Sequence, residues 1–390
     1  MPISSLTLAQ QQLLSQARIM SAYDVRIVET PKEFAAFISL PWTIYKNYPH
    51  WVPPIKKSVS RLLTPGEHPF WDHAERELYI ARANGKVAGR IAAIRDEHHN
   101  SVHGENAGFF GFFETMDDYK IAEALYDAAS RWCKSKGCTF IRGPASPSSN
   151  DEYGFLLEGF DKDPAILMPY NPEYYIGFSE RYGFRKAKDL YAFRKPVNSD
   201  IPVRIERIMQ RAKKRSCFKL RCIDPKNFTR DIKAIATLYN DAWEKNWGFV
   251  PMTEEEMIRT AEDMKAFYDP ELIIIAEVDG KPVGIALTVP NVNEVLVKLN
   301  GKMNLWGIIR FLIYKRKIKG CRSLVGGCLP EYRNTGLIAE MFYETAQRAR
   351  GRYEWCELGW NLEDNELINK FDEEIGGEIY KKYRLYEKPL

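Results

Sequence analysis

Histidine is confined to one end of this chain. All six histidines fall within the first 103 of its 390 residues, and none follows. A Ser–His–Asp catalytic triad housed in the second half is therefore excluded. Chemistry in that half must rest on carboxylates, tyrosine, lysine, cysteine, backbone amides or a bound co-substrate.

Cysteine and long apolar runs are also scarce. The seven cysteines are scattered, with no CxxC pair and no Cys/His spacing suited to zinc, which predicts reduced thiols and no metal site. No apolar stretch approaches the roughly 18 residues that span a bilayer. Residues 1–23 lack the charged start and apolar centre of a signal peptide and are interpreted as a polar leader. These absences predict a cytoplasmic protein.

The composition is that of a folded protein with hidden basic segments. Hydrophobic residues make up 45% and aromatics 13%, which is too much apolar surface to leave solvated, and 390 residues predict two domains. The net charge is only +4. However, 204–221 holds eight basic residues and one acid, and 292–320 holds seven and one. The rest of the chain is therefore acidic.

An internal repeat organises the chain. Residues 77–94 (ELYIARANGKVAGRIAAI) and 271–289 (ELIIIAEVDGKPVGIALTV) each predict an apolar strand, an Asn-Gly or Asp-Gly turn and a second apolar strand. Their glycines match at an offset of 195 residues, and NPEYYIGFSERYGF at 171 matches NELINKFDEEIGG at 365 at almost the same offset. Two independent matches predict two tandem copies of one domain.

Each copy has the same predicted order of elements: strand, helix, hairpin, strand, helix, strand, helix, strand. Besides the hairpins, the expected strands are 25–29, 108–113, 138–142, 190–195, 219–223, 323–328, 355–359 and 379–387. The expected helices are 31–44, 119–136, 173–182, 231–244, 253–266, 337–350 and 366–374. This order predicts an α+β fold of two tandem domains, each a mixed β-sheet flanked by helices. The predicted boundaries are a leader at 1–23, a first domain at 24–198, a basic connector at 199–218 and a second domain at 219–390.

The copies differ by reciprocal insertions, which indicates that one copy holds a co-substrate and the other shapes an acceptor pocket. The first insertion lies in GPASPSSNDEYGFLLEGFDKDPAILMPYNPEYY, at 143–175, and its start is a Pro/Ser/Asn-rich loop. It either binds the acceptor or packs between the domains. A pocket needs apolar walls and a few polar groups, and the candidates are Asn150, Asp151, Glu152, Tyr153, Tyr170 and Tyr174.

The second insertion contains NLWGIIRFLIYKRKIKG, which starts at residue 304. Its aliphatic residues share one helical face, and a basic cluster follows directly. This pattern predicts an interfacial helix over 304–319 in peripheral contact with anionic lipid of the inner membrane face. The alternative is a core helix with a solvated basic end.

Residues 325–349, VGGCLPEYRNTGLIAEMFYETAQRA, predict a strand, a polar turn and a helix. Several backbone amides of 333–336 are expected to be unpaired, and the helix dipole with Arg333 favours a phosphate there. The residues predicted to contact the co-substrate are Cys328, Leu329, Arg333, Asn334, Thr335, Gly336 and Leu337.

Arg333-x-x-Gly336 after a strand, with 365–376 downstream, resembles the acyl-CoA-binding half of GCN5-related N-acetyltransferases, the GNAT superfamily. The family loop, Arg/Gln-x-x-Gly-x-Gly/Ala, cradles the pyrophosphate of coenzyme A, and Ile338 takes its third position here. The resemblance implies acyl-CoA as co-substrate, Asn365 facing the pantetheine, and Asp372 in place of the usual acidic Tyr. Residues 114–120 of the first copy contain neither Gly nor Arg, so no pyrophosphate site is expected there. Both copies together resemble bacterial double-GNAT N-acyltransferases, with a link to bacterial ceramide synthases.

Acyl transfer from a thioester to an amine needs a neutral amine, a polarised carbonyl and a proton for the leaving sulfur. Backbone amides at the end of the strand 324–329 are the predicted oxyanion donors. Glu357 on the adjacent strand is the predicted general base. Asp372, Tyr380 and Tyr383 are candidates for returning the proton.

The leading hypothesis is therefore an acyl-CoA-dependent N-acyltransferase acting on a small-molecule or lipid-like amine, of sphingoid-base type among others. Two alternatives stay open. One is a Fem-type aminoacyl transferase to a cell-wall precursor, which the basic segment 204–221 supports. The other is a non-catalytic GNAT-fold binding protein, which the imperfect loop and the missing Tyr support. Nucleic acid is not expected as a partner.

Overall fold

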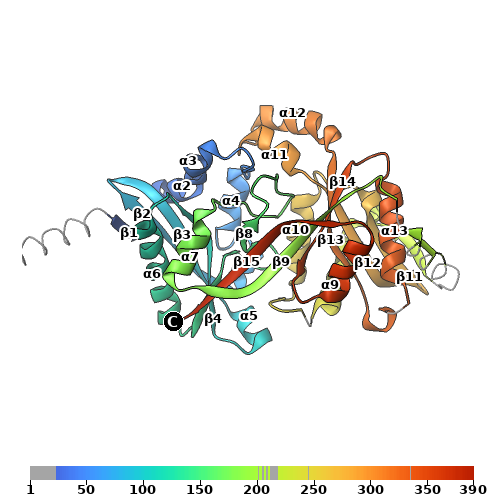
Figure 1. The fold of residues 1–390 in the computed structure, drawn as a ribbon, viewed down its shortest axis with the longest axis horizontal. Helices are drawn as coiled ribbons and strands as arrows, with labels where there is room; N and C mark the ends of the chain where they lie inside the picture. The colour runs from blue at the N-terminus through green and yellow to red at the C-terminus, as the bar shows by residue number, and fades with distance from the viewer. Residues whose placement is uncertain are drawn as a thin grey trace, which may run out of the picture.

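The computed structural model describes residues 23–390, except 201, 204–205, 208–209, 211–217, 245 and 334. The predicted leader, apart from Tyr23, and much of the predicted connector lie outside the described residues. Figure 1 shows strands running through the middle of the molecule with helices on both sides. None of the described helices is long and apolar enough to cross a bilayer.

The first half keeps the predicted order and adds short elements. Its strands are β1 (Tyr23–Ile27), β2 (Ala74–Ala83), β3 (Lys86–Asp96), β4 (Ala107–Thr115), β5 (Phe140–Gly143), β6 (Ala145–Ser146), β7 (Glu152–Tyr153), β8 (Phe155–Glu158) and β9 (Arg185–Pro196). Its α-helices are α2 (Pro31–Ser39), α3 (Pro41–Ile44), α4 (Lys56–Leu62), α5 (Glu97–His103), α6 (Tyr119–Ser135) and α7 (Tyr174–Tyr182). The predicted helix at 31–44 is two helices, because Pro41 has no amide hydrogen to continue the first.

The second half repeats the pattern. Its strands are β10 (Lys219–Cys222), β11 (Ile273–Val278), β12 (Lys281–Pro290), β13 (Gly320–Cys328), β14 (Trp355–Leu362) and β15 (Glu378–Pro389). Its α-helices are α9 (Phe228–Trp243), α10 (Glu254–Met264), α11 (Asn293–Leu299), α12 (Leu305–Tyr314), α13 (Leu337–Ala349) and α14 (Glu366–Glu374).

The two predicted hairpins are confirmed, down to their turns. Asn84 and Gly85 have φ of 51° and 77°, and Asp279 and Gly280 have 49° and 76°. Two successive residues with positive φ form the type I′ turn, which explains why Asn-Gly and Asp-Gly occur there. The repeat seen in the sequence is therefore a repeat of backbone geometry.

The second matched glycine in each hairpin lets a helix approach the sheet. Gly89 pairs with Ala81, and Gly284 pairs with Ala276. A Cβ added at Gly89 would lie 2.7 Å from a side-chain atom of α6, and one at Gly284 would lie 3.1 Å from side-chain atoms of α13. The same small residue thus serves the same packing role in both copies.

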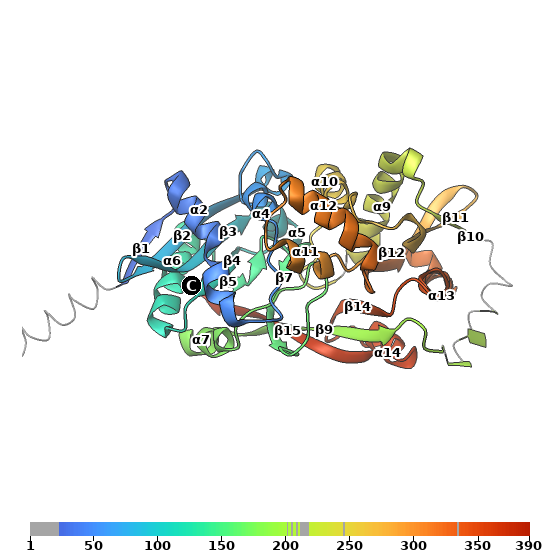
Figure 2. The same ribbon diagram turned by 90° about the horizontal axis from the view of Figure 1, so that it is seen from above.

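The two halves exchange their last strands. β9 of the first half pairs with β14, β15 of the second half pairs with β5, and β9 and β15 pair with each other. Figures 1 and 2 show these two long strands crossing the centre. They join both halves into one 13-stranded sheet, in which β8 pairs with β15 beside the order β1-β2-β3-β4-β5-β15-β9-β14-β13-β12-β11-β10. The predicted domains, 24–198 and 219–390, are divided by position in the sequence. In three dimensions, each half instead contributes its last strand to the sheet of the other half.

Both faces of the sheet are covered by core clusters. In β11, Ile274 packs with Met341 of α13, while Ile275 packs with Ile235 of α9 on the opposite face. In β3, Ile91 packs toward Leu125 of α6 while Ala92 faces the other cluster. Successive side chains of a strand point to opposite faces, so both faces need apolar residues. This explains the continuous apolar runs in the hairpin strands.

Candidate active site

Each half contains one pair of parallel strands that separate partway along. β4 and β5 pair only from Ala107 to Phe109, and β13 and β14 pair only from Gly320 to Ser323. In the first half the separated region is filled by its own chain. A Cβ on Gly111 would lie 1.7 Å from the backbone oxygen of Ala145, and the Phe112 amide donates to the Ser146 Oγ at 3.0 Å. The second region, beyond Ser323 and Leu358, is here called the splay.

Along the splay, every second backbone amide of β13 points toward β14. Leu329 donates its amide to the Val283 carbonyl of β12 at 2.9 Å, so this predicted contact group is already used. Amides alternate in direction along an antiparallel strand, so those of Cys328 and Gly326 point to the splay. They are the backbone donors that the predicted oxyanion role requires.

A buried ion pair closes the base of the splay. The Nε of Arg322 lies 2.7 Å from Glu357 Oε1 and 3.2 Å from the Gly359 carbonyl, and Tyr380 donates its hydroxyl to Glu357. Glu357 is completely buried, which raises its pKa although Arg322 and Tyr380 act in the opposite direction. The predicted base is therefore shut off from solvent by its neighbours. Arg322 was missed by the sequence reasoning, although a lone Arg in an apolar strand signals a buried acidic partner.

A buried lysine of the second half holds the first insertion by hydrogen bonds. Lys381 of β15 has no exposed surface, and its Nζ donates to the carbonyls of Gly159 and Lys162 at 2.7 and 2.8 Å. Burial lowers its pKa to about 8. Arg322 also donates to the Ile166 carbonyl. Two cations from the second half thus fix the insertion of the first half.

Within the described part of the chain, the hydroxyl of Tyr383, one of the predicted catalytic groups, has no hydrogen-bond partner. The side chain is fully buried on β15, and its oxygen has no hydrogen bond among the described residues. Its pKa is raised by burial and then by the charges of Glu357 and, more weakly, Glu152. A buried hydroxyl without a partner is uncommon in folded proteins.

The predicted phosphate loop is partly as expected. Helix α13 starts after Gly336, whose φ is 86°, and Gly336 provides no side-chain cap. The amides of Arg333 and Thr335 donate to Pro330 and Tyr332, so the expectation of unpaired amides is wrong for these two. The first-turn amides of a helix have no intrahelical partner, and those from Leu337 onward suit a phosphate. The Arg333 guanidinium donates to the Ala242 carbonyl at 3.2 Å, and Asn334 lies outside the described residues.

Asp372 and Asn365 lie on the last helix of the second half. Asn361 of β14 donates its side-chain amide to Asp372 Oδ2 at 2.8 Å. Burial raises the pKa of Asp372 to about 7, so this group exchanges a proton near neutral pH. Asn365 is the residue before α14 and is partly exposed.

The acceptor candidates 150–153 contact the second half. Tyr239 of α9 donates its hydroxyl to Asn150 Oδ1 at 2.8 Å, and the Tyr153 ring lies 6.1 Å from the ring of Trp360 on β14. A small hollow beside Tyr153 is lined by both halves, including Ser148 and Val250. These contacts place Tyr153 beside the part of β14 that lies beyond Leu358, and Asn150 beside α9.

Two carboxyl groups in this segment have raised pKa values. Burial raises the pKa of Asp151 to about 7, although Ser148 donates to its Oδ2 at 2.8 Å. Burial of the carboxyl group also raises the pKa of Glu152 to about 7, and the charges of Glu114 and Asp151 add to the shift, although the residue as a whole keeps exposed surface.

Tyr170 and Tyr174 are placed differently from the rest of the predicted acceptor group. Tyr170 donates its hydroxyl to the Phe160 carbonyl at 3.1 Å, and Tyr174 donates to the Thr115 carbonyl at 2.8 Å. Both hydroxyls are thus used within the first half. Nearby, Glu114 accepts hydrogen bonds of 2.8 Å from Tyr45 and Tyr175. This group was not predicted, although an acid ending an apolar strand was a signal for it.

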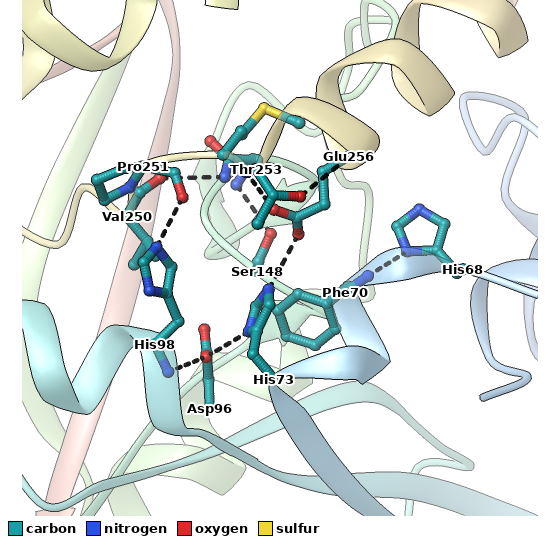
Figure 3. A network of polar contacts seen from close by, with 12 residues as sticks. His68, Phe70, His73, Asp96, His98, Ser148, Val250, Pro251, Thr253 and Glu256 are labelled. Atoms are coloured by element: carbon teal, nitrogen blue, oxygen red, sulfur yellow. Dashed lines mark hydrogen bonds and ion pairs between the residues drawn. The ribbon is translucent and has the colours of Figure 1, made fainter. Parts of the chain in front are cut away.

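A histidine network links the first half to the segment around Pro251 and Glu256, as Figure 3 shows. His73 lies between two carboxylates, with Nδ1 at 2.9 Å from Asp96 and Nε2 at 3.3 Å from Glu256 of α10. His98 and His103 donate to the carbonyls of Pro251 and Phe249 at 3.1 and 2.8 Å. The histidines of the first half therefore hold the segment that follows α9. Among the described residues, no group of three or more metal-ligating side chains gathers.

The fold and the site define a tandem GNAT-fold protein. A tandem GNAT protein from the clavulanic acid biosynthesis pathway superposes with a TM-score of 0.56 at 12% identity, covering 94% of this chain and 98% of that one. A GCN5-related N-acetyltransferase from Sphaerobacter thermophilus superposes with a TM-score of 0.51 at 12% identity, covering 94% and 96%. At this identity the likeness concerns the fold. No family model matches the chain.

Two curated proteins are much closer in sequence. The bacterial ceramide synthase of Caulobacter vibrioides is 34% identical over 375 residues, which are 93% of this chain and 96% of that protein. Protein YghO of Escherichia coli is 32% identical over 375 residues, which are 94% and 95%. The chain belongs to the family that contains these two proteins.

Proposed function

We propose that this protein is an acyl-CoA-dependent N-acyltransferase whose acceptor is a long-chain, lipid-like amine. The observation that carries the proposal is the 34% identity, over nearly the full length of both chains, with a protein named bacterial ceramide synthase. A ceramide is the amide of a fatty acid and a long-chain amine. The tandem GNAT fold supports the same reaction class.

The second half would hold the acyl donor. Acyl-CoA supplies a thioester-activated acyl group and a pyrophosphate. The start of α13 has free first-turn amides and Gly336 beside them, which fits a pyrophosphate without a metal ion. The amides of Cys328 and Gly326 face the splay and would polarise the acyl carbonyl. The first half cannot act in the same way, because Ala145 and Ser146 fill its separated strands.

Glu152 is the best placed general base. A base must be accessible to the amine and have a pKa near the working pH. Glu152 keeps exposed surface and has a pKa raised to about 7, whereas Glu357 is completely buried against Arg322. In the proposed step the amine nitrogen loses its proton to the Glu152 carboxylate and forms the bond to the acyl carbon. The carbon–sulfur bond breaks, and the leaving thiolate needs a proton.

Tyr383 and Asp372 are the two candidates for returning that proton. The Tyr383 hydroxyl is buried without a partner, and Asp372 has a pKa near 7. Glu357 then acts as a positioning residue, because it holds Arg322 and Tyr380 at the base of the splay. The proton that Glu152 gains leaves to solvent through its exposed side.

The proposal is tested by offering the purified protein acyl-CoA donors from acetyl to stearoyl with sphinganine or a short primary amine. Thiol release and mass spectrometry of the amide are the readouts. We expect the product only with long-chain donors and the long-chain amine. No thiol release with any pair, from protein that melts cooperatively, would reject the proposal.

Binding measurements separate the two alternatives. Calorimetric binding of palmitoyl-CoA that is lost when Arg333 and Gly336 are replaced together by Ala supports the donor site. Binding without turnover indicates the non-catalytic GNAT-fold protein. Absence of binding together with turnover of an aminoacyl-tRNA indicates the Fem-type transferase.

A further inference from the structure

Helix α12 exposes almost all of its apolar side chains. Leu305 and Trp306 are 72% and 73% exposed, and Leu312 and Ile313 are each 53% exposed. Ile308 and Ile309 are also exposed, while Gly307 and Phe311 are the buried positions of the helix. The alternative of a core helix is therefore wrong. Figure 1 shows α12 at the edge of the molecule, beyond α11.

The helix is well anchored, so its exposed face is part of the native fold. Phe311 and Ile318 pack with Val295 and Leu299 of the preceding helix in one core cluster. The Asn304 side chain caps the N-terminus by accepting from the Gly307 amide at 3.0 Å. A soluble protein seldom leaves such a contiguous apolar patch without a partner.

The charges around α12 identify the partner's chemistry. Residues 292–320 contain seven basic residues and one acid, Glu294. The Glu294 carboxylate is used by the amides of Lys319 and Gly320 at 2.9 and 2.8 Å. Lys302, Arg310, Lys315, Arg316 and Lys317 are all exposed. A second copy of the chain would place like charges opposite each other, which opposes association through this face.

We propose that α12 and its basic flank dock on the surface of an anionic bilayer, with the helix lying in the plane of the interface. The apolar residues enter the acyl boundary and the lysines and arginines contact lipid phosphates. Ile166, in the insertion fixed by Arg322, belongs to the same core cluster as Phe311. Docking therefore brings the insertion beside the site close to the membrane. This inference does not depend on the proposed function.

Sedimentation with sucrose-loaded vesicles tests the proposal on the full chain. Vesicles of phosphatidylcholine with phosphatidylglycerol are compared with phosphatidylcholine alone at low salt. We expect preferential binding to the anionic vesicles. The triple change Leu305→Ser, Trp306→Ser, Ile309→Ser should weaken it about tenfold or more. The triple change Lys315→Gln, Arg316→Gln, Lys317→Gln should weaken it about a hundredfold.

Leu367 provides a matched control, because it is 86% exposed on α14, which lies apart from α12 in Figure 2. Leu367→Ser should leave vesicle binding unchanged. Equal binding to both vesicle types, no binding, or an equal loss in the Leu367 variant would overturn the proposal. So would light scattering that shows a dimer dissociated by the apolar triple change. Thermal melts check that each variant folds.

Discussion

The Nε of Arg322 lies 2.7 Å from the Oε1 of Glu357, and both side chains are buried where β13 and β14 separate. The pair also holds the Ile166 carbonyl from one side and the Tyr380 hydroxyl from the other. One ion pair therefore connects both halves of the chain and the strands β13, β14 and β15. We expect its loss to lower the free energy of unfolding.

Removing one member of this pair should be strongly destabilising. Arg322→Met or Glu357→Leu leaves the other charge buried and unpaired, and we expect each to cost about 3–5 kcal/mol in urea unfolding. The double variant should cost clearly less than the sum. Lys233→Ala, which removes an exposed ion pair with Glu254, is the control and should change little. Additive single and double effects would show that the two side chains act separately.

Replacing Glu152 should remove the acidic limb of the activity profile. Its pKa is raised to about 7, and a base works only when deprotonated, so kcat/KM should rise with pH through about 7 and then level off. In Glu152→Gln we expect a loss of about 10²–10⁴-fold and no such limb. Asp151→Asn is the matched control, because Asp151 is the neighbouring carboxyl with a similar pKa. A limb that persists in Glu152→Gln and vanishes in Asp151→Asn would transfer the role to Asp151.

Tyr383→Phe should separate activity from stability. The hydroxyl is buried without a partner among the described residues, so we expect its removal to change the unfolding free energy by between zero and a gain of about 1 kcal/mol. Activity should fall at least about tenfold if this group supplies the proton. In contrast, Tyr174→Phe breaks the 2.8 Å bond to Thr115 and should cost about 1 kcal/mol while activity stays. Full activity of Tyr383→Phe would leave Asp372 as the acid.

The contact between His73 and its two carboxylates should make stability depend on pH. Burial alone would lower the pKa of His73, but hydrogen bonds and charges from Asp96 and Glu256 raise it to about 10. Because its pKa is raised, His73 contributes fully to the free energy of unfolding below its ordinary pKa of 6.5. This contribution is lost as the pH rises through about 10. Burial alone would raise the pKa of Glu256, but hydrogen bonds from His73 and Thr253 and the charge of His73 lower it, so its contribution to stability is lost in acid.

We therefore expect wild type to exceed His73→Gln in unfolding free energy by about 1–3 kcal/mol near pH 6, with the difference vanishing toward pH 10. Urea unfolding across this range measures it. His50→Gln is the control, since His50 pairs with the exposed Asp163 on the first insertion. A constant difference at every pH would show that the imidazole only fills space.

Local features of the fold were predictable because they depend on neighbouring residues. The Asn-Gly and Asp-Gly turns fix both hairpins, and the glycines four residues later reappear under α6 and α13. Asn150 to Tyr153 were selected by composition, and they do reach the second half through Tyr239 and Trp360. Patterns of this kind require no knowledge of which strand pairs with which.

The strand exchange and the buried charges could not be predicted in the same way. β9 and β15 both look like the last strand of a self-contained domain, and their apolar patterns would fit either sheet. Glu357 was selected as a base because it lies on the strand next to the predicted oxyanion donors, but it is buried against Arg322, which also contacts the distant insertion. Contacts between residues far apart in the sequence therefore decide whether a carboxylate is available for catalysis or is part of a structural ion pair.

The exchange of β9 and β15 also constrains how such a chain can evolve. A duplicated gene ordinarily leaves two units that can be lost, shuffled or fused elsewhere one at a time. Here each unit lacks a strand unless the other is present, since β5 pairs with β15 and β14 pairs with β9. The copies are consequently inherited as one piece. The first copy, in which Ala145 and Ser146 fill the space between the separated strands, is then kept because the sheet of the second copy needs its strand β9.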